Sequence, residues 1–242
     1  MKKNGVDLKE SELVYGYSWI PLSGKYLYSA NFFMLKCHEI EMSKTSKYPD
    51  VYGSHHAYTI NSIISSVAFL ETYINQFYCS LIDAPFPNQK KIVGKKLHRI
   101  QKMWAMGIPR TASYSIPKKY QIALILSDNV SFSDKDPIYQ KIITITQLRN
   151  ALIHYEPEWT ELNEDPQIER EKMKKLGKKL QHEKFPSNPF VNDYMEFYPV
   201  RCLGYGCTKW VYDNSLNFVI EFENRMGIES TDLKEYKNTG AV

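Results

Sequence analysis

The stretch that decides the fold is His55–Ile82, which reads HHAYTINSIISSVAFLETYINQFYCSLI. Its apolar residues recur every three or four positions, at Ile60, Ile63, Ile64, Val67, Leu70, Ile74, Phe77, Tyr78 and Leu81. This is the period of an α-helix, carried through roughly six turns. Polar residues interrupt the run, whereas a membrane span needs about 20 predominantly apolar residues. The stretch therefore predicts a buried central helix and no membrane span.

A single charge, Glu71, lies within the apolar stripe of this helix. A lone buried carboxylate is destabilising unless it gains a charged partner or a proton. A second apolar stripe, made by Ile138, Ile142, Ile145, Leu148 and Leu152, also contains one charge, Arg149. We therefore expect the two helices to pack together and Glu71 to pair with Arg149, in the bidentate geometry that arginine and carboxylate favour.

The second stripe ends in Leu148-Arg149-Asn150-Ala151-Leu152-Ile153-His154-Tyr155, followed by Glu156-Pro157. Residues five apart on an ideal helix point about 140° away from each other, so Arg149 and His154 do not share a face. Pro157 disfavours helical geometry at the residue before it, which predicts that the last turn unwinds and swings the imidazole. Asn150 precedes His154 by four positions, within reach to orient its ring.

Length and composition predict a globular chain with one substantial core, since 43% of its 242 residues are hydrophobic and 24% are charged. We expect an irregular N-terminal arm at 1–24, a single all-α domain at 25–227 with a charged helical insertion at about 160–204, and a flexible tail at 228–242. Within the domain we expect helices at 25–44, 116–127 and from Pro137, a loop at 185–206, and a last helix that stops at Gly227.

The cysteines Cys37, Cys79, Cys202 and Cys207 are scattered, which predicts reduced thiols that lie mostly in the core of a cytoplasmic protein. Cys202, Cys207 and His182 lack zinc-ligand spacing, and His55-His56 is interpreted as a surface or capping pair, so no metal is expected. The sequence has no glycine-rich phosphate-binding loop and no nucleophile elbow, so no cofactor is expected either.

The segment 88–119 contains nine positive charges and no acidic residue. The net charge of the whole chain is only +4, so the rest of the chain is net negative. Clustered cations next to an aromatic ring suit a phosphate backbone and stacking bases. The candidate nucleic-acid-binding residues are Lys90, Lys91, Lys95, Lys96, Arg99, Lys102 and Trp104. An ordinary solvated helix surface explains the same lysines equally well.

Ala68-Phe69-Leu70-Glu71-Thr72-Tyr73-Ile74-Asn75, the segment Leu148–His154 and the closing tryptophan-containing helix with Gly227 together resemble the HEPN superfamily. The resemblance covers roughly 25–159 and 205–227. It implies an all-α HEPN-like helical bundle and usually a homodimer. Many members are metal-independent endoribonucleases with an arginine, four to six residues and a histidine, and often a polar residue directly after the arginine. Arg149, Asn150 and His154 fit that pattern, and Glu71 is similar to an acidic residue that some members carry on an earlier helix.

The resemblance implies catalytic roles for Arg149, His154, Asn150 and Glu71. An imidazole can take a proton from an RNA 2′-hydroxyl, and a guanidinium can stabilise the charge on the scissile phosphate. Asn150 would orient His154, and Glu71 would position Arg149. If a two-fold axis joins two copies, one histidine could act as base and the other as acid. The setting expected is a toxin or anti-phage defence effector, with an antitoxin or defence-system partner.

Two other interpretations remain open. In one, Glu71 and Arg149 form only a buried ion pair and His154 caps a helix. In the other, the chain is a non-catalytic HEPN-like helical module that binds nucleic acid or a partner protein.

Overall fold

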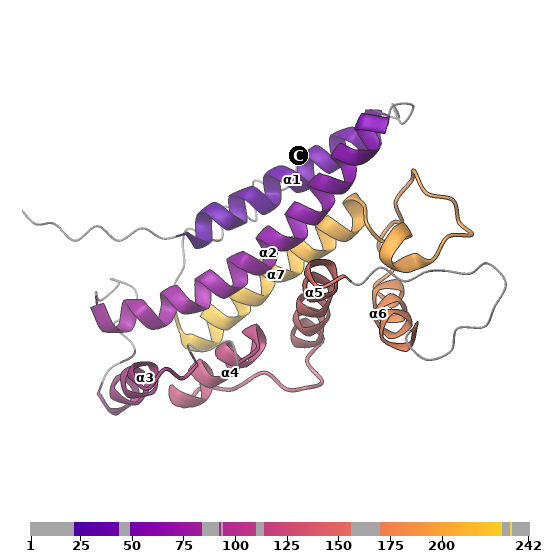
Figure 1. Cartoon of the computed structure of the whole chain (residues 1–242). Helices are drawn as coiled ribbons and strands as arrows, with labels where there is room; N and C mark the ends of the chain where they lie inside the picture. The colour runs from indigo at the N-terminus through magenta and orange to yellow at the C-terminus, as the bar shows by residue number, and fades with distance from the viewer. Residues whose placement is uncertain are drawn as a thin grey trace, which may run out of the picture.

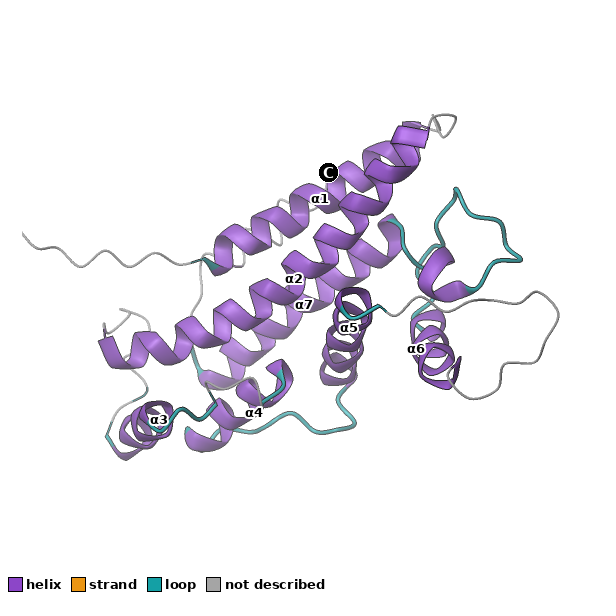
Figure 2. Ribbon diagram, in the orientation of Figure 1, coloured by secondary structure: helices purple, strands orange, loops and turns teal. Residues whose placement is uncertain are grey.

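A computed structural model of the chain describes residues 22–43, 49–83, 92, 94–109, 114–155, 170–228 and 233. All regular elements in these ranges are helices, and the loops between them contain no strand (Figure 2). The prediction of an all-α fold is confirmed. None of the helices described is long and apolar enough to cross a membrane.

Three long helices lie side by side and form the body of the fold (Figure 1): α1 (Ser23–Ser43), α2 (Pro49–Asp83) and α7 (Tyr205–Met226). The predicted central helix is α2, which packs against both of the others. Its Phe77 meets Phe222 of α7 edge to face, with ring centroids 5.3 Å apart. The aromatic core continues into Tyr120, whose ring packs on Phe222 and whose hydroxyl donates to the Leu70 carbonyl at 2.7 Å.

Two of the predicted helix starts were placed too late. Helix α1 begins at Ser23, where the backbone N–H donates to Gln76 Oε1 at 3.0 Å, so the arm boundary at residue 24 was wrong. Helix α2 begins at Pro49 and runs through Gly53, a position interpreted from sequence as a break. Gly53 is exposed, and the helix tolerates it because the N-terminal turns of α2 pack along α1.

Three shorter helices cover one side of the long ones: α3 (Lys95–Ala105), α4 (Ile116–Leu126) and α5 (Pro137–Ile153). Proline occupies the first turn of both α4 and α5, where its missing N–H is not needed. The predicted start of α5 at Pro137 is confirmed. Helix α5 packs on α2 and α7, so the predicted contact between the helices of Glu71 and Arg149 is also confirmed.

The predicted insertion contains α6 (Arg170–His182) and η2 (Phe197–Arg201). Helix α6 is more than an exposed charged helix, because Leu176 and Leu180 are buried and it packs against α5 and η2. The segment 185–206 is only partly a loop. Its Asn188 is buried and donates to the Leu203 carbonyl at 2.9 Å, which fixes the entry to α7.

The last helix ends as the sequence predicts. Gly227 takes a left-handed conformation with φ 68°, and its N–H donates to the Asn224 carbonyl at 3.1 Å. Only glycine adopts this φ without strain, which explains the stop. The expected tail is described at Leu233, which is buried and therefore packed rather than free.

Candidate functional site

The C-terminal end of α5 carries the arginine and histidine that the sequence singled out. The helix is regular through Ile153, and His154 is its C-cap with φ −105° and ψ 39°. The helix thus ends at His154, before the Glu156-Pro157 pair that was expected to end it. Because the helix is regular up to this point, Arg149 and His154 occupy positions about 140° apart around its axis and about 7.5 Å apart along it.

Arg149 is half-buried, and its Nε atom is buried without a hydrogen-bond partner. Buried polar groups are nearly always hydrogen-bonded, and one left unsatisfied is destabilising by about 1–3 kcal/mol. The guanidinium therefore has hydrogen-bonding capacity that the described part of the protein leaves unused.

His154 is exposed, and so are its neighbours Ile153 and Tyr155. Its backbone N–H donates to the Asn150 carbonyl at 2.9 Å, which is the last hydrogen bond of the helix. Asn150 is exposed as well. The contact between Asn150 and His154 in the structure is thus made by the backbone, whereas the sequence predicted that the Asn150 side chain orients the ring.

The predicted pairing of Glu71 with Arg149 was wrong. Glu71 Oε1 accepts a hydrogen bond from Lys119 Nζ of α4 at 3.1 Å, and the same ammonium contacts Asn75 Oδ1 at 3.4 Å. The burial of the pair is also inverted. The side chain of Glu71 is 42% exposed, whereas that of Lys119 is 2% exposed. The buried charge on this face is therefore the lysine, which the sequence placed among the surface cations.

The candidate nucleic-acid-binding residues divide into three groups. Lys90 and Lys91 lie outside the described residues. Lys95 and Lys102 of α3 are exposed. Arg99 and Lys96 both face Asp128, at 2.7 Å and 3.9 Å from its Oδ2, and the hydrogen bond from Arg99 lowers the pKa of that carboxyl. A phosphate would compete with Asp128 for these two cations.

Trp104 is not available for stacking on bases, so the prediction of that role was wrong. The side chain is 6% exposed and lies parallel to the Tyr78 ring of α2, with ring centroids 5.0 Å apart and an interplanar angle of 7°. Because α3 is strongly amphipathic, its tryptophan faces the core together with Ile100 while the lysines face away.

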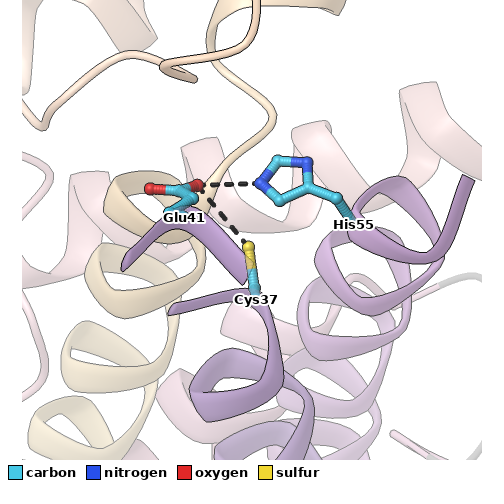
Figure 3. A group of neighbouring side chains, drawn as sticks. All are labelled: Cys37, Glu41 and His55. Atoms are coloured by element: carbon cyan, nitrogen blue, oxygen red, sulfur yellow. Dashed lines mark hydrogen bonds and ion pairs between the residues drawn. The ribbon is translucent and has the colours of Figure 1, made fainter. Parts of the chain in front are cut away.

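A group of polar side chains that the sequence did not identify lies where α1, α2 and α7 meet (Figure 3). Glu41 Oε1 accepts hydrogen bonds from His55 Nε2 at 2.8 Å, from the Tyr205 backbone N–H at 2.6 Å and from Cys37 Sγ at 3.7 Å. His55 is fully buried, which corrects its interpretation as a surface or capping residue. The signal available in the sequence was the i, i+4 spacing of Cys37 and Glu41, which places them on one helix face.

The ligand-type atoms of Cys37, Glu41 and His55 lie within 4.8 Å of one another, so these three residues could approach one metal ion. A structural zinc site uses four protein ligands. Here the Glu41 oxygen already accepts three hydrogen bonds, and burial raises the pKa of the Cys37 thiol to about 12, which keeps it neutral. We therefore assign the group to capping the N-terminus of α7, where a carboxylate also interacts favourably with the helix dipole.

No protein-family model, no curated protein and no solved structure matches the chain.

Proposed function

We propose that the chain is a metal-independent endoribonuclease of the HEPN type, with Arg149 and His154 as the catalytic residues. One observation carries the proposal. At the C-terminal end of α5 a half-buried guanidinium has an Nε atom without a hydrogen-bond partner, and an exposed histidine follows five positions later. A phosphate oxygen is the acceptor that satisfies such a guanidinium best.

The separation of the two side chains suits the two halves of one RNA linkage. Arg149 holds the non-bridging oxygens of the scissile phosphate, and His154 takes the proton of the neighbouring 2′-hydroxyl. The 2′-oxygen then attacks phosphorus, and the bond to the 5′-oxygen breaks. That oxygen leaves as a hydroxyl after it takes a proton from solvent. The products are a 2′,3′-cyclic phosphate and a 5′-hydroxyl, and no metal enters the reaction.

The positioning roles are assigned differently from the sequence-based prediction. Glu71 is engaged with Lys119, so it acts on Arg149 only through the packing of α2 against α5. The exposed Lys95 and Lys102 of α3 supply a sequence-independent attraction for the RNA backbone. A toxin or anti-phage defence setting, with an antitoxin or defence-system partner, belongs to the same proposal.

The decisive experiment is cleavage of a mixed RNA substrate by the purified full chain in excess chelator. We expect cleavage with 2′,3′-cyclic phosphate ends, lost by about a hundredfold or more in His154→Ala and in Arg149→Ala. His182→Ala is the matched control, because His182 is an exposed histidine at the end of another helix, α6. Circular dichroism checks that each variant remains folded.

Two outcomes would contradict the proposal. Binding of RNA without any cleavage would identify a non-catalytic HEPN-like module instead. Cleavage that persists in folded His154→Ala would identify a different site. In cells, expression of the wild-type chain should arrest growth, and Arg149→Ala should relieve the arrest.

A further inference from the structure

The outer face of α1 is unusual for a helix that faces solvent. The helix buries Leu27, Ala30, Met34 and Cys37 against the rest of the fold. Opposite them, Tyr28 is 62% exposed and Phe32 is 42% exposed. The helix is thus apolar on both faces, whereas a helix with one buried face normally carries charges on the other. Exposed aromatic rings in a row mark an interaction surface.

The charges on this outer face are few and regularly placed. On a helical wheel, Lys25, Tyr28, Phe32, Lys36 and Glu39 lie within about 40° of the direction opposite the buried residues. We call these five residues the α1 stripe. Leu22, 46% exposed, and Met42, 67% exposed, flank its two ends.

The α1 stripe is complementary to itself. When two copies of α1 cross antiparallel with Phe32 on the two-fold axis, the residue seven positions before Phe32 meets the residue seven positions after it in the other copy. Lys25 then meets Glu39. Four positions on either side, Tyr28 meets Lys36, a tyrosine ring opposite a cation. Ten positions on either side, Leu22 meets Met42.

From this symmetry we propose that the α1 stripe binds the α1 stripe of a second copy of the chain, antiparallel and centred on Phe32. The axis brings two exposed phenylalanine rings together, and every charge of the stripe meets an opposite charge or an aromatic ring. In the single chain Lys36 Nζ lies 2.6 Å from Glu39 Oε2 and 5.9 Å from the Phe32 ring centroid. The second copy extends this local pairing into a ladder about 21 Å long between Lys25 and Glu39.

Self-complementarity is what favours a second copy over an unrelated partner. An isologous interface uses the same patch on both subunits, so each residue at distance n before the axis must suit the residue at distance n after it. All three pairs of the α1 stripe and its ends meet this condition. A surface shaped for a different protein has no reason to meet it.

The proposed dimer is independent of the proposed reaction. Helix α5 packs on α2, α6 and α7, and α1 packs on the other side of α2 and α7 (Figure 1). A dimer through α1 therefore keeps the two α5 ends apart, and each Arg149–His154 site acts alone. A failure of the dimer test leaves the cleavage test unaffected, and the reverse also holds.

The test is sedimentation analysis of the full chain over a range of concentrations. We expect a wild-type dimer, and dissociation constants at least about tenfold higher for Phe32→Glu, Lys25→Glu and Glu39→Lys, because each variant places like charges opposite each other. Lys135→Glu is the control, since Lys135 is exposed outside α1 and the variant has the same net charge as Lys25→Glu.

Mixing distinguishes the antiparallel register from other contacts. Lys25→Glu mixed with Glu39→Lys restores both charge pairs across the two-fold axis, so the mixture should form a heterodimer although each variant alone is weakened. A wild-type chain that stays monomeric at its highest soluble concentration would overturn the proposal. So would a dimer that is insensitive to Phe32→Glu, or a mixture that fails to recover.

Discussion

Lys119, buried to 2% exposure, donates from its ammonium to the half-exposed carboxylate of Glu71 at 3.1 Å. The two residues of this pair stand in different positions energetically. If the carboxylate is removed, a buried cation loses its charged partner, and only the Asn75 contact at 3.4 Å remains. If the lysine is removed, Glu71 returns to water.

This asymmetry predicts unequal effects of the two substitutions. Glu71→Ala should lower the free energy of unfolding by about 1–3 kcal/mol, because it leaves a buried charge poorly satisfied. Lys119→Met should change it by less than about 1 kcal/mol, because an apolar chain of similar length fills the same space. The double variant should be as stable as Lys119→Met alone. Urea denaturation measures all three, and equal losses in the two single variants would contradict the asymmetry.

The stack of Trp104 on Tyr78 predicts a structural role for the tryptophan. Trp104→Ala should lower the free energy of unfolding by about 3–5 kcal/mol, since it removes a large buried ring. Trp104→Phe keeps a ring against Tyr78 and should cost less. Affinity for RNA should be unchanged in folded Trp104→Phe but reduced in Lys102→Gln, measured by fluorescence polarisation. Loss of RNA affinity in Trp104→Phe with unchanged stability would show that the ring contacts nucleic acid.

The hydrogen bonds to Glu41 predict that one carboxylate oxygen holds three helices together. Glu41→Ala removes the acceptor for the Tyr205 N–H and for His55 Nε2, and should lower the free energy of unfolding by about 1–3 kcal/mol. Glu41→Gln keeps an acceptor oxygen at the same place and should lose less. Thermal unfolding of the two variants is the comparison. A larger loss in Glu41→Gln than in Glu41→Ala would rule out the capping role.

Burial of the cysteines predicts how the protein responds to alkylation and alkali. The pKa values of Cys37 and Cys202 are raised from 9.0 to about 12, first of all by burial, so both thiols stay neutral in the folded protein. Iodoacetamide at about pH 8 should spare them, and the less buried Cys79 should react first.

The same pKa values fix the sign of the pH dependence. Between about pH 9 and pH 12 the unfolded chain loses these thiol protons and the folded chain keeps them. The free energy of unfolding should therefore fall as pH rises through this window. Replacing Cys37 by alanine should make the fall less steep, as followed by urea denaturation at successive pH values. Rapid alkylation of Cys37 in the native state would contradict its burial.

The sequence by itself determined the helices, because the signals for a helix are local. A 3.6-residue apolar period marked the cores of α2 and α5, Pro137 marked a first turn, and Gly227 marked a stop that needs a left-handed φ. These signals depend on neighbours within a few positions, so they do not require knowledge of the tertiary structure. The positions of Arg149 and His154 at the end of α5 followed from the same signals.

Only the tertiary structure decided which side chains meet. Periodicity tells which face of a helix is turned inward, but not which side chain of another helix arrives there. Glu71 and Arg149 both lay on inward-looking stripes, yet α4 brings Lys119 to Glu71 from 48 positions away. Likewise, Glu41 meets His55 because α1 and α2 pack along each other, and meets Tyr205 because α7 begins against them. Partners so far apart in the chain leave no periodic trace in the sequence, so their pairing emerges only when the helices pack.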